Sequence, residues 1–154
     1  KSYNTILPEA KKDEFLLILG GDHCIPIGTI PAIKEARKNV GIVWVDAHAD
    51  INTPSFSGSG NMHGMPVAFL MGLVKNISAY PSMEWFKPCI NPEDIVYIGL
   101  RDLDQPEKET IKKLGIKAYT VSYRHYIDRS YIYIYGYLCS IKLIDRMYIY
   151  PYIV

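Results

Sequence analysis

The chain has 154 residues, of which 49% are apolar and 21% charged, and its formal net charge is +1. This composition is typical of a folded globular domain, and the small net charge gives no sign of a nucleic acid or an anionic membrane as partner. No apolar run approaches the roughly 20 residues that a membrane span requires. We therefore expect one globular domain that binds neither nucleic acid nor membrane.

Apolar runs alternate with helical spacings along the first 120 residues. The stretches that predict strands, rich in apolar residues as in a sheet buried on both faces, are 15–19, 41–45, 94–100 and 116–119. Those that predict helices are 26–38, 66–74 and 106–114. A Ser-, Gly- and Asn-rich stretch at 54–61 predicts a loop. Strands that alternate with helices predict an α/β fold with a mainly parallel sheet.

The composition changes near residue 121. The last 34 residues, 121–154, hold nine Tyr and seven Ile, and the run Tyr131-Ile132-Tyr133-Ile134-Tyr135 lacks the apolar–polar alternation of a half-buried strand. Repeated TA dinucleotides would encode such a run. We therefore divide the chain into a partial α/β domain, 1–120, and a tail, 121–154, interpreted as non-native or frameshifted sequence. A strand-rich segment is the alternative.

Cysteine usage indicates a reducing compartment. Cys24, Cys89 and Cys139 are odd in number and widely spaced, which predicts neither a disulfide framework nor a zinc site. We expect reduced thiols and a cytoplasmic location, with the mitochondrion as the open alternative.

Polar side chains follow the ends of the predicted strands. Asp46, His48 and Asp50 come directly after 41–45, and their spacing of two would point them to one side of an extended backbone. Two carboxylates and an imidazole suit Mn²⁺ or a similar divalent ion, which would offset the repulsion between the carboxylates. His23 follows 15–19 and Gly20-Gly21, and it is a candidate fourth ligand at the same edge of a parallel sheet. A solvated Asp-rich turn is the alternative.

His63 lies between the predicted loop and the predicted helix at 66–74. Near a metal-bound water, a histidine with a pKa close to neutrality can transfer protons. The alternative is that His63 caps or packs against the following helix.

Four stretches together resemble the ureohydrolase family, and the arginases within it. They are Gly20-Gly21-Asp22-His23 and the segments 44–54, 59–66 and 97–104, in the family's order and spacing. The resemblance implies a three-layer α/β/α fold with a mainly parallel sheet, incomplete in this chain, and a binuclear Mn²⁺ centre. It implies His23, Asp46, His48 and Asp50 as metal ligands, Asp46 as the bridge between the ions, and His63 as the catalytic proton shuttle.

The same resemblance implies hydrolysis of L-arginine to L-ornithine and urea. The positions that match the family's substrate-binding residues are Asn52, Ser57, Ser59 and Asn61 for the α-carboxylate and Asp104 and Glu107 near the α-amino group. Hydrogen-bond donors for a carboxylate and acids for an ammonium are the expected chemistry. A related ureohydrolase such as an agmatinase is the alternative, although agmatine lacks the carboxylate.

Parts of the family's pattern do not occur in this sequence. A second Asp-x-Asp ligand pair and a later Glu for the guanidinium are absent after Tyr119, where Asp128 and Asp145 stand alone. The chain also begins at Lys1 without the early strands of the family. We expect catalysis by this chain alone to be impaired. A non-catalytic truncated product that binds metal weakly, or that associates with intact subunits, is a further alternative, and we expect the intact enzyme to be a homo-oligomer.

Overall fold

The computed structural model describes residues 1–12, 14–120 and 146–151. Its α-helices and strands, in chain order, are α1 (Ser2–Ala10), α2 (Pro26–Ala36), β1 (Val40–Val45), α3 (Pro66–Leu70), β2 (Ile95–Leu100), α4 (Gln105–Leu114), β3 (Lys117–Thr120) and β4 (Arg146–Pro151). Short 3₁₀ helices are η1 (Met62–Gly64), η2 (Ile77–Ala79) and η3 (Pro92–Asp94). Among the helices so described, none has the length and apolar character needed to cross a bilayer.

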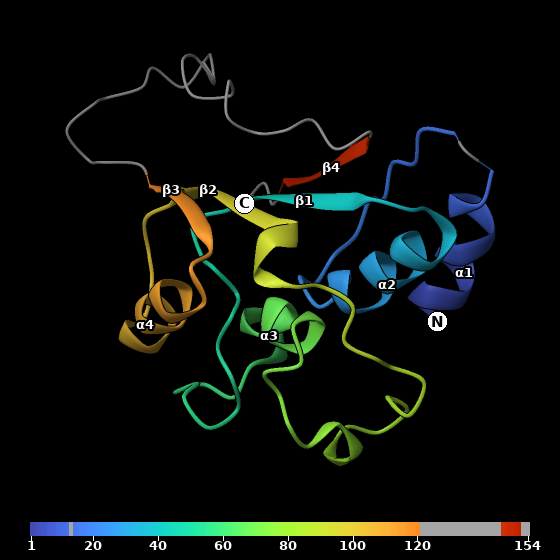
Figure 1. Cartoon of the computed structure of the whole chain (residues 1–154). Coiled ribbons are helices and arrows are strands. Elements are labelled where there is room, and N and C mark those ends of the chain that lie inside the picture. The colour runs from blue at the N-terminus through green and yellow to red at the C-terminus, as the bar shows by residue number, and fades with distance from the viewer. Residues whose placement is uncertain (13, 121–145, 152–154) are drawn as a thin grey trace.

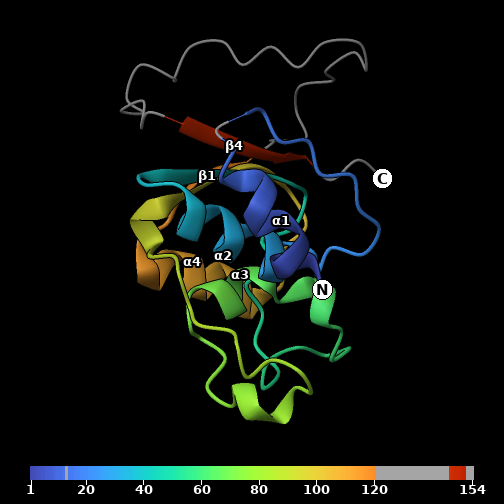
Figure 2. The same cartoon turned by 90° about the vertical axis from the view of Figure 1, so that its right-hand side faces the viewer.

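The strands form one sheet in the order β3-β2-β1-β4, with every neighbouring pair parallel (Figure 1). Helices α2, α3 and α4 lie on the same side of this sheet, and α1 packs against α2 (Figures 1 and 2). The predicted α/β fold with a parallel sheet is therefore confirmed. The second outer layer of the expected α/β/α sandwich is not found among the described residues.

The predicted strand at 15–19 is wrong, because this run lies outside any strand. Its side chains nevertheless alternate: Phe15, Leu17 and Leu19 are 91%, 67% and 86% exposed. The intervening Leu16 and Ile18 pack against a small apolar cluster of Ala10, Ile33 and Val40. The physical reason is competition for one edge: β2 pairs with one side of β1, and β4 pairs with the other along the whole of Val40–Val45.

The other predicted strands lie within a residue or two of β1, β2 and β3. Helix α3 ends at Leu70 rather than at the predicted Val74, because the chain turns at Gly72 with a positive φ of 70°. Helix α1 was not anticipated. Residues 121–145 and 152–154 of the predicted tail lie outside the described residues, and 146–151 form β4, so the boundary at 120/121 stays a prediction.

The main core lies between the sheet and its helices. Trp44 of β1, Tyr97 of β2 and Phe69 of α3 are each 0% exposed and belong to one apolar cluster. Each such buried side chain contributes about 1.5–3 kcal/mol from the removal of its apolar surface from water. This packing fixes β1 and β2 side by side, and it thereby fixes the two loops that leave their carboxyl ends.

Candidate metal centre

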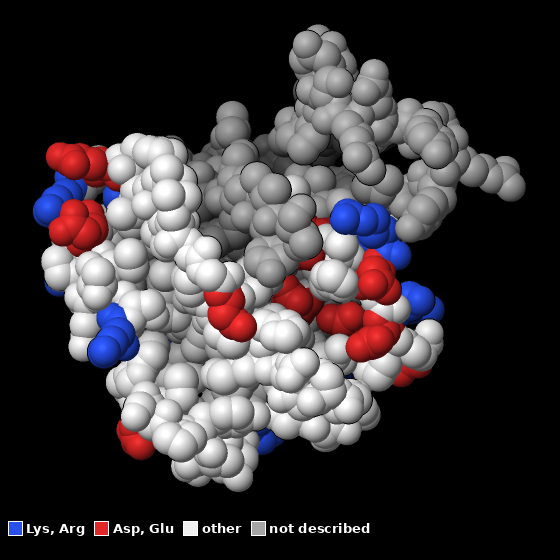
Figure 3. Space-filling model, turned by 180° about the vertical axis from the view of Figure 1, so that it is seen from behind, with Lys and Arg blue, Asp and Glu red and all other residues white. Residues whose placement is uncertain are grey.

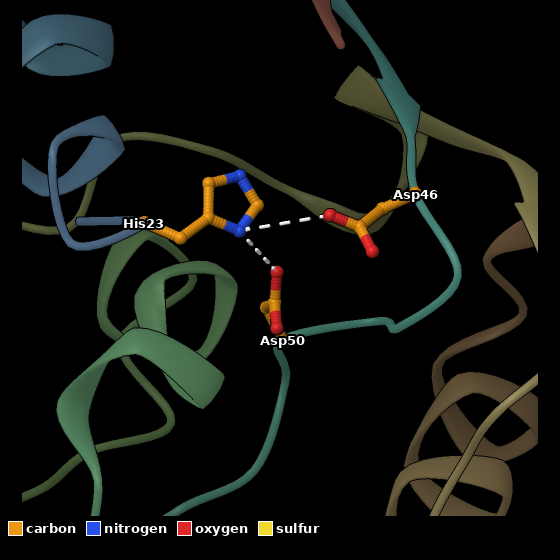
Figure 4. Close-up of side chains that lie close together, drawn as sticks. All are labelled: His23, Asp46 and Asp50. Carbon is orange, nitrogen blue, oxygen red and sulfur yellow. Dashed lines mark ion pairs between the residues drawn. The ribbon is translucent and has the colours of Figure 1, made fainter. Parts of the chain in front are cut away.

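Three of the predicted ligands converge beyond the end of β1 (Figure 4). Asp46 follows the last residue of β1, Asp50 lies on the loop that continues from it, and His23 comes from the turn before α2. His23 Nδ1 is 2.8 Å from Asp50 Oδ2 and 3.7 Å from Asp46 Oδ2. One potential ligand atom from each residue lies within 4.8 Å of the other two. The sequence prediction that these residues share one edge of the sheet therefore holds in the structure.

The chemistry of this cluster fits a divalent cation. Asp46 and Asp50 are only 7% and 6% exposed, and among the described residues the ion pairs of both carboxylates are with histidines. Asp50 Oδ2 is buried and accepts no hydrogen bond of good geometry within the described part of the chain, although the ring of His23 is near. Buried carboxylates without a strong cationic partner are unfavourable. Oxygen and imidazole ligands suit Mn²⁺ or a similar ion.

The neighbouring carboxylates change the pKa of His23. Burial acts to lower the pKa of His23, but the adjacent carboxylate of Asp50 and the charges of Asp46 and Asp22 outweigh it and raise that pKa above its ordinary value. A proton on His23 thus takes the place that a cation would fill. Metal and proton compete for the same site.

His48 lies on the other side of Asp46. Its Nδ1 is 3.3 Å from Asp46 Oδ1, its Nε2 is 3.4 Å from Asp102 Oδ2, and its side chain is 53% exposed. One oxygen of Asp46 thus faces His23 while the other faces His48. Asp102, just beyond β2, was not among the predicted ligands, although its place after a strand end was a usable signal.

A cleft of about 610 Å³ adjoins the cluster. All the predicted substrate-binding residues line it: Asn52, Ser57, Ser59, Asn61, Asp104 and Glu107. The lining also includes His48, Asp50 and His63. Figure 3 shows acidic side chains gathered around a hollow on the side of the molecule where α4 lies. The cleft therefore combines a polar wall with strong negative charge, which suits a ligand that carries a cationic group.

Hydrogen bonds hold the polar wall of the cleft in shape. Ser57 Oγ accepts from the backbone N–H of Gly60 (3.0 Å), and Ser59 Oγ accepts from that of Asn61 (3.2 Å). These bonds use the serine oxygens as acceptors, so they do not consume the hydroxyl protons. The hydroxyls can therefore donate to a carboxylate in the cleft.

The acidic residues of the cleft are tied to α4. Asp104 and Glu107 form a capping box at its N-terminus, and Glu107 also accepts from the backbone N–H of Ile51 (3.3 Å). Asn52 Nδ2 donates to Asp104 Oδ2 at 2.9 Å. Burial raises the pKa of Glu107, with the nearby charges of Asp50 and Asp104 acting in the same direction against its backbone hydrogen bonds. Glu107 is only 4% exposed, so its contact with a ligand is confined to the edge of its carboxylate.

His63 lies on η1 at the rim of the same cleft. Its side chain is 55% exposed, and its Nδ1 is 4.0 Å from Asp22 Oδ2. A half-exposed imidazole beside a carboxylate and a cleft can exchange protons with solvent and with a bound ligand. Its position is consistent with the role implied for it, and that role stays a prediction.

The fold and this site define an α/β protein with a polar cleft beside a cluster of residues that could hold a metal ion. The chain belongs to the arginase family, whose model matches residues 2–132. The match continues past residue 120 into a part of the chain outside the described residues.

Comparison with known proteins supports this assignment. The chain is 44% identical to the arginase of Saccharomyces cerevisiae over 128 residues, which are 82% of this chain and 38% of the yeast protein. It is 47% identical to arginase-1 of Homo sapiens over 116 residues, which are 74% of this chain and 36% of the human protein.

Solved structures give the same result. The cold-adapted arginase of Glaciozyma antarctica is 43% identical, with a TM-score of 0.69 over 77% of this chain and 42% of that one. An Entamoeba histolytica arginase crystallised with L-ornithine is 39% identical, with a TM-score of 0.68 over 77% of this chain and 40% of that one. The chain thus spans less than half the length of these relatives.

Proposed function

We propose that this chain carries one side of a binuclear manganese centre, together with the amino-acid subsite, of an arginase-type hydrolase that converts L-arginine to L-ornithine and urea. The observation that carries the proposal is the placement of Asp46, with one carboxylate oxygen toward His23 and the other toward His48, at the mouth of a polar cleft. The Entamoeba relative crystallised with L-ornithine supports the substrate class.

The residues of the cleft can perform separate parts of this reaction. His23, Asp46 and Asp50 would hold a divalent ion, which would lower the pKa of a water ligand and so supply a nucleophile at neutral pH. Serine hydroxyls and the amides of Asn52 and Asn61 donate hydrogen bonds to the α-carboxylate of the substrate. Their geometry holds the guanidinium carbon toward the cluster.

Proton transfer falls to His63 in this proposal. Hydrolysis breaks the bond between the guanidinium carbon and the side-chain nitrogen that stays with ornithine, and this leaving nitrogen needs a proton. His63, half-exposed at the rim of the cleft, donates it and is reprotonated from solvent. Asp104 and Glu107 orient the substrate by attracting its α-ammonium group.

A second candidate function is metal binding without turnover by this chain alone. The sequence lacks a second Asp-x-Asp pair after Tyr119, and His48 is 53% exposed. Two or three ligands of which one is largely in solvent hold a second ion poorly. In this case the chain binds metal weakly or associates with intact subunits, which we expect to form homo-oligomers.

Two measurements on the purified chain test both candidates. Titration with Mn²⁺, followed by the electron paramagnetic resonance signal of the free ion, gives stoichiometry and affinity. A urea assay with L-arginine and with agmatine gives activity and substrate class. The main proposal predicts that the chain binds at least one ion at His23, Asp46 and Asp50 and releases urea, at an impaired rate, from L-arginine in preference to agmatine. One bound ion without urea release would support the second candidate, and no Mn²⁺ binding by the folded chain would refute both.

A further inference from the structure

A buried hydroxyl group contacts the loop that carries the metal ligands. Tyr97 of β2 is 0% exposed and belongs to the main apolar core, yet its hydroxyl donates a hydrogen bond to the backbone carbonyl of Ala49 at 2.8 Å. Phenylalanine would fill the same apolar space without a polar atom. Since a buried hydroxyl is unfavourable unless it is hydrogen-bonded, the bond to Ala49 is what makes tyrosine acceptable at this position.

Ala49 lies between two of the candidate ligands, His48 and Asp50. Asp50 has a left-handed backbone with φ of 51°, a conformation that non-glycine residues adopt rarely and that persists where neighbouring contacts fix it. The peptide before Asp50 is held by Tyr97, and the peptide after it by Glu107, whose Oε1 accepts from Ile51 N–H at 3.3 Å. These two bonds fix the backbone on both sides of Asp50.

The start of the loop that carries the ligands, just after β1, is also held by hydrogen bonds. The N–H of Asp46 donates to the carbonyl of Ile98 at 3.1 Å, and the carbonyl of Ala47 accepts from Arg101 and Asp102 at 2.9 and 3.0 Å. These contacts come from β2 and the residues after it, as does the contact from Tyr97. Strand β2 therefore acts as the support on which the ligand loop rests.

We propose that Tyr97 is a positioning residue of the metal centre: through Ala49 it holds Asp50 in the backbone conformation that directs its carboxylate toward His23. This inference rests on the proposed metal centre. Tyr97 touches neither metal nor substrate. Supporting hydrogen bonds of this kind commonly account for 10–100-fold in metal affinity, and we expect about that effect here.

The test is Tyr97→Phe, which keeps the ring and removes only the hydroxyl oxygen. Tyr80→Phe is the matched control, because Tyr80 packs edge-on against Phe69 at the margin of the same core and, among the described residues, makes no hydrogen bond to the ligand loop. Three quantities are measured on each variant of the full 154-residue chain. They are the Kd for Mn²⁺, the melting temperature without metal, and the hydrogen exchange of the peptide that contains Ala49 and Asp50.

We expect Tyr97→Phe to weaken Mn²⁺ binding by about 10–100-fold and to speed exchange at Ala49 and Asp50, while Tyr80→Phe changes neither. A purely structural role would lower the melting temperature and leave the Kd of the folded protein unchanged. Equal Kd values for wild type and Tyr97→Phe therefore overturn the role of Tyr97 while leaving the metal centre intact. No Mn²⁺ binding by the folded wild-type chain overturns the metal centre itself, and with it the role of Tyr97.

Discussion

Replacement of Asp46 by asparagine should change the stability of the metal-free protein in opposite directions at high and low pH. Asparagine keeps Oδ1, which accepts a 2.8 Å hydrogen bond from the His48 N–H, and removes the negative charge. The ligand oxygens of Asp46 and Asp50 lie within 4.8 Å of each other. At an effective dielectric constant of about 20, two like charges at this distance repel by about 3.5 kcal/mol.

The opposing interaction is with His23. Its Nδ1 is 3.7 Å from Asp46 Oδ2, so a protonated ring attracts this carboxylate by about 4.5 kcal/mol on the same scale. The attraction exceeds the repulsion by about 1 kcal/mol, but only while His23 carries its proton. Because the folded protein raises the pKa of His23, the stabilisation from this proton is fully present below the ordinary pKa of 6.5 and is lost as the pH rises through the raised pKa of the folded state.

At about pH 6, where His23 is protonated, Asp46→Asn should therefore destabilise the metal-free protein by about 1 kcal/mol. At a pH above the raised pKa of His23 the ring is neutral, and relief of the repulsion should stabilise the protein by up to about 3.5 kcal/mol. Urea unfolding in the presence of a chelator measures both values. Asp94→Asn, which removes the surface partner of Lys34, is a control without a pH-dependent sign. A shift of the same sign for Asp46→Asn at both pH values would refute the electrostatic argument.

Three further predictions concern the separate parts of the site. His48→Ala should remove the second equivalent of Mn²⁺ from a titration and abolish urea release by the complete enzyme; unchanged stoichiometry would mean that His48 is not a ligand. His63→Ala should lower kcat by about 100-fold or more while the metal content stays the same, and loss of both ions would instead make His63 a ligand. Asp104→Asn should weaken calorimetric binding of L-ornithine to the Mn²⁺-loaded protein by about 10-fold or more, because a charged hydrogen bond is lost. The melting temperature should fall only by the loss of the bond from Asn52, since asparagine is also a good N-cap residue. Equal ornithine affinity would place the α-amino group elsewhere.

Local apolar runs predicted strands β1 and β2. The runs at β1 and β2 are apolar and buried, and the structure pairs them in parallel as expected. The run at 15–19 carries the same signal, but strand formation also needs a free edge, and the edge of β1 is paired with β4. That competition depends on residues more than 120 positions away in the chain and cannot be found in a window of five.

The spacing of two between Asp46, His48 and Asp50 has a different structural result from the one that the sequence predicted. A period of two on extended backbone would direct Asp46, His48 and Asp50 to one side. The loop after β1 is not extended, and the left-handed backbone at Asp50 returns its carboxylate toward His23, while His48 faces Asp102. His48 and Asp50 therefore lie on two sides of Asp46, and not on one side as the spacing predicted.

Residues that support the site were harder to predict, because each also has an ordinary structural explanation. Tyr97 has the sequence signal of a core aromatic in a strand. Asp104 and Glu107 have the spacing of a capping box, and the structure shows that they form one. In all three cases the structural contact and the proposed functional contact use the same side chain. The capping box fixes the start of α4 against the ligand loop through Ile51 and Asn52, so it also sets where the acidic end of the cleft lies relative to the metal cluster. Stability and function are therefore coupled at these residues. A substitution can separate them only if it keeps one contact and removes the other: Tyr97→Phe keeps the packing of the ring, and Asp104→Asn keeps the helix cap.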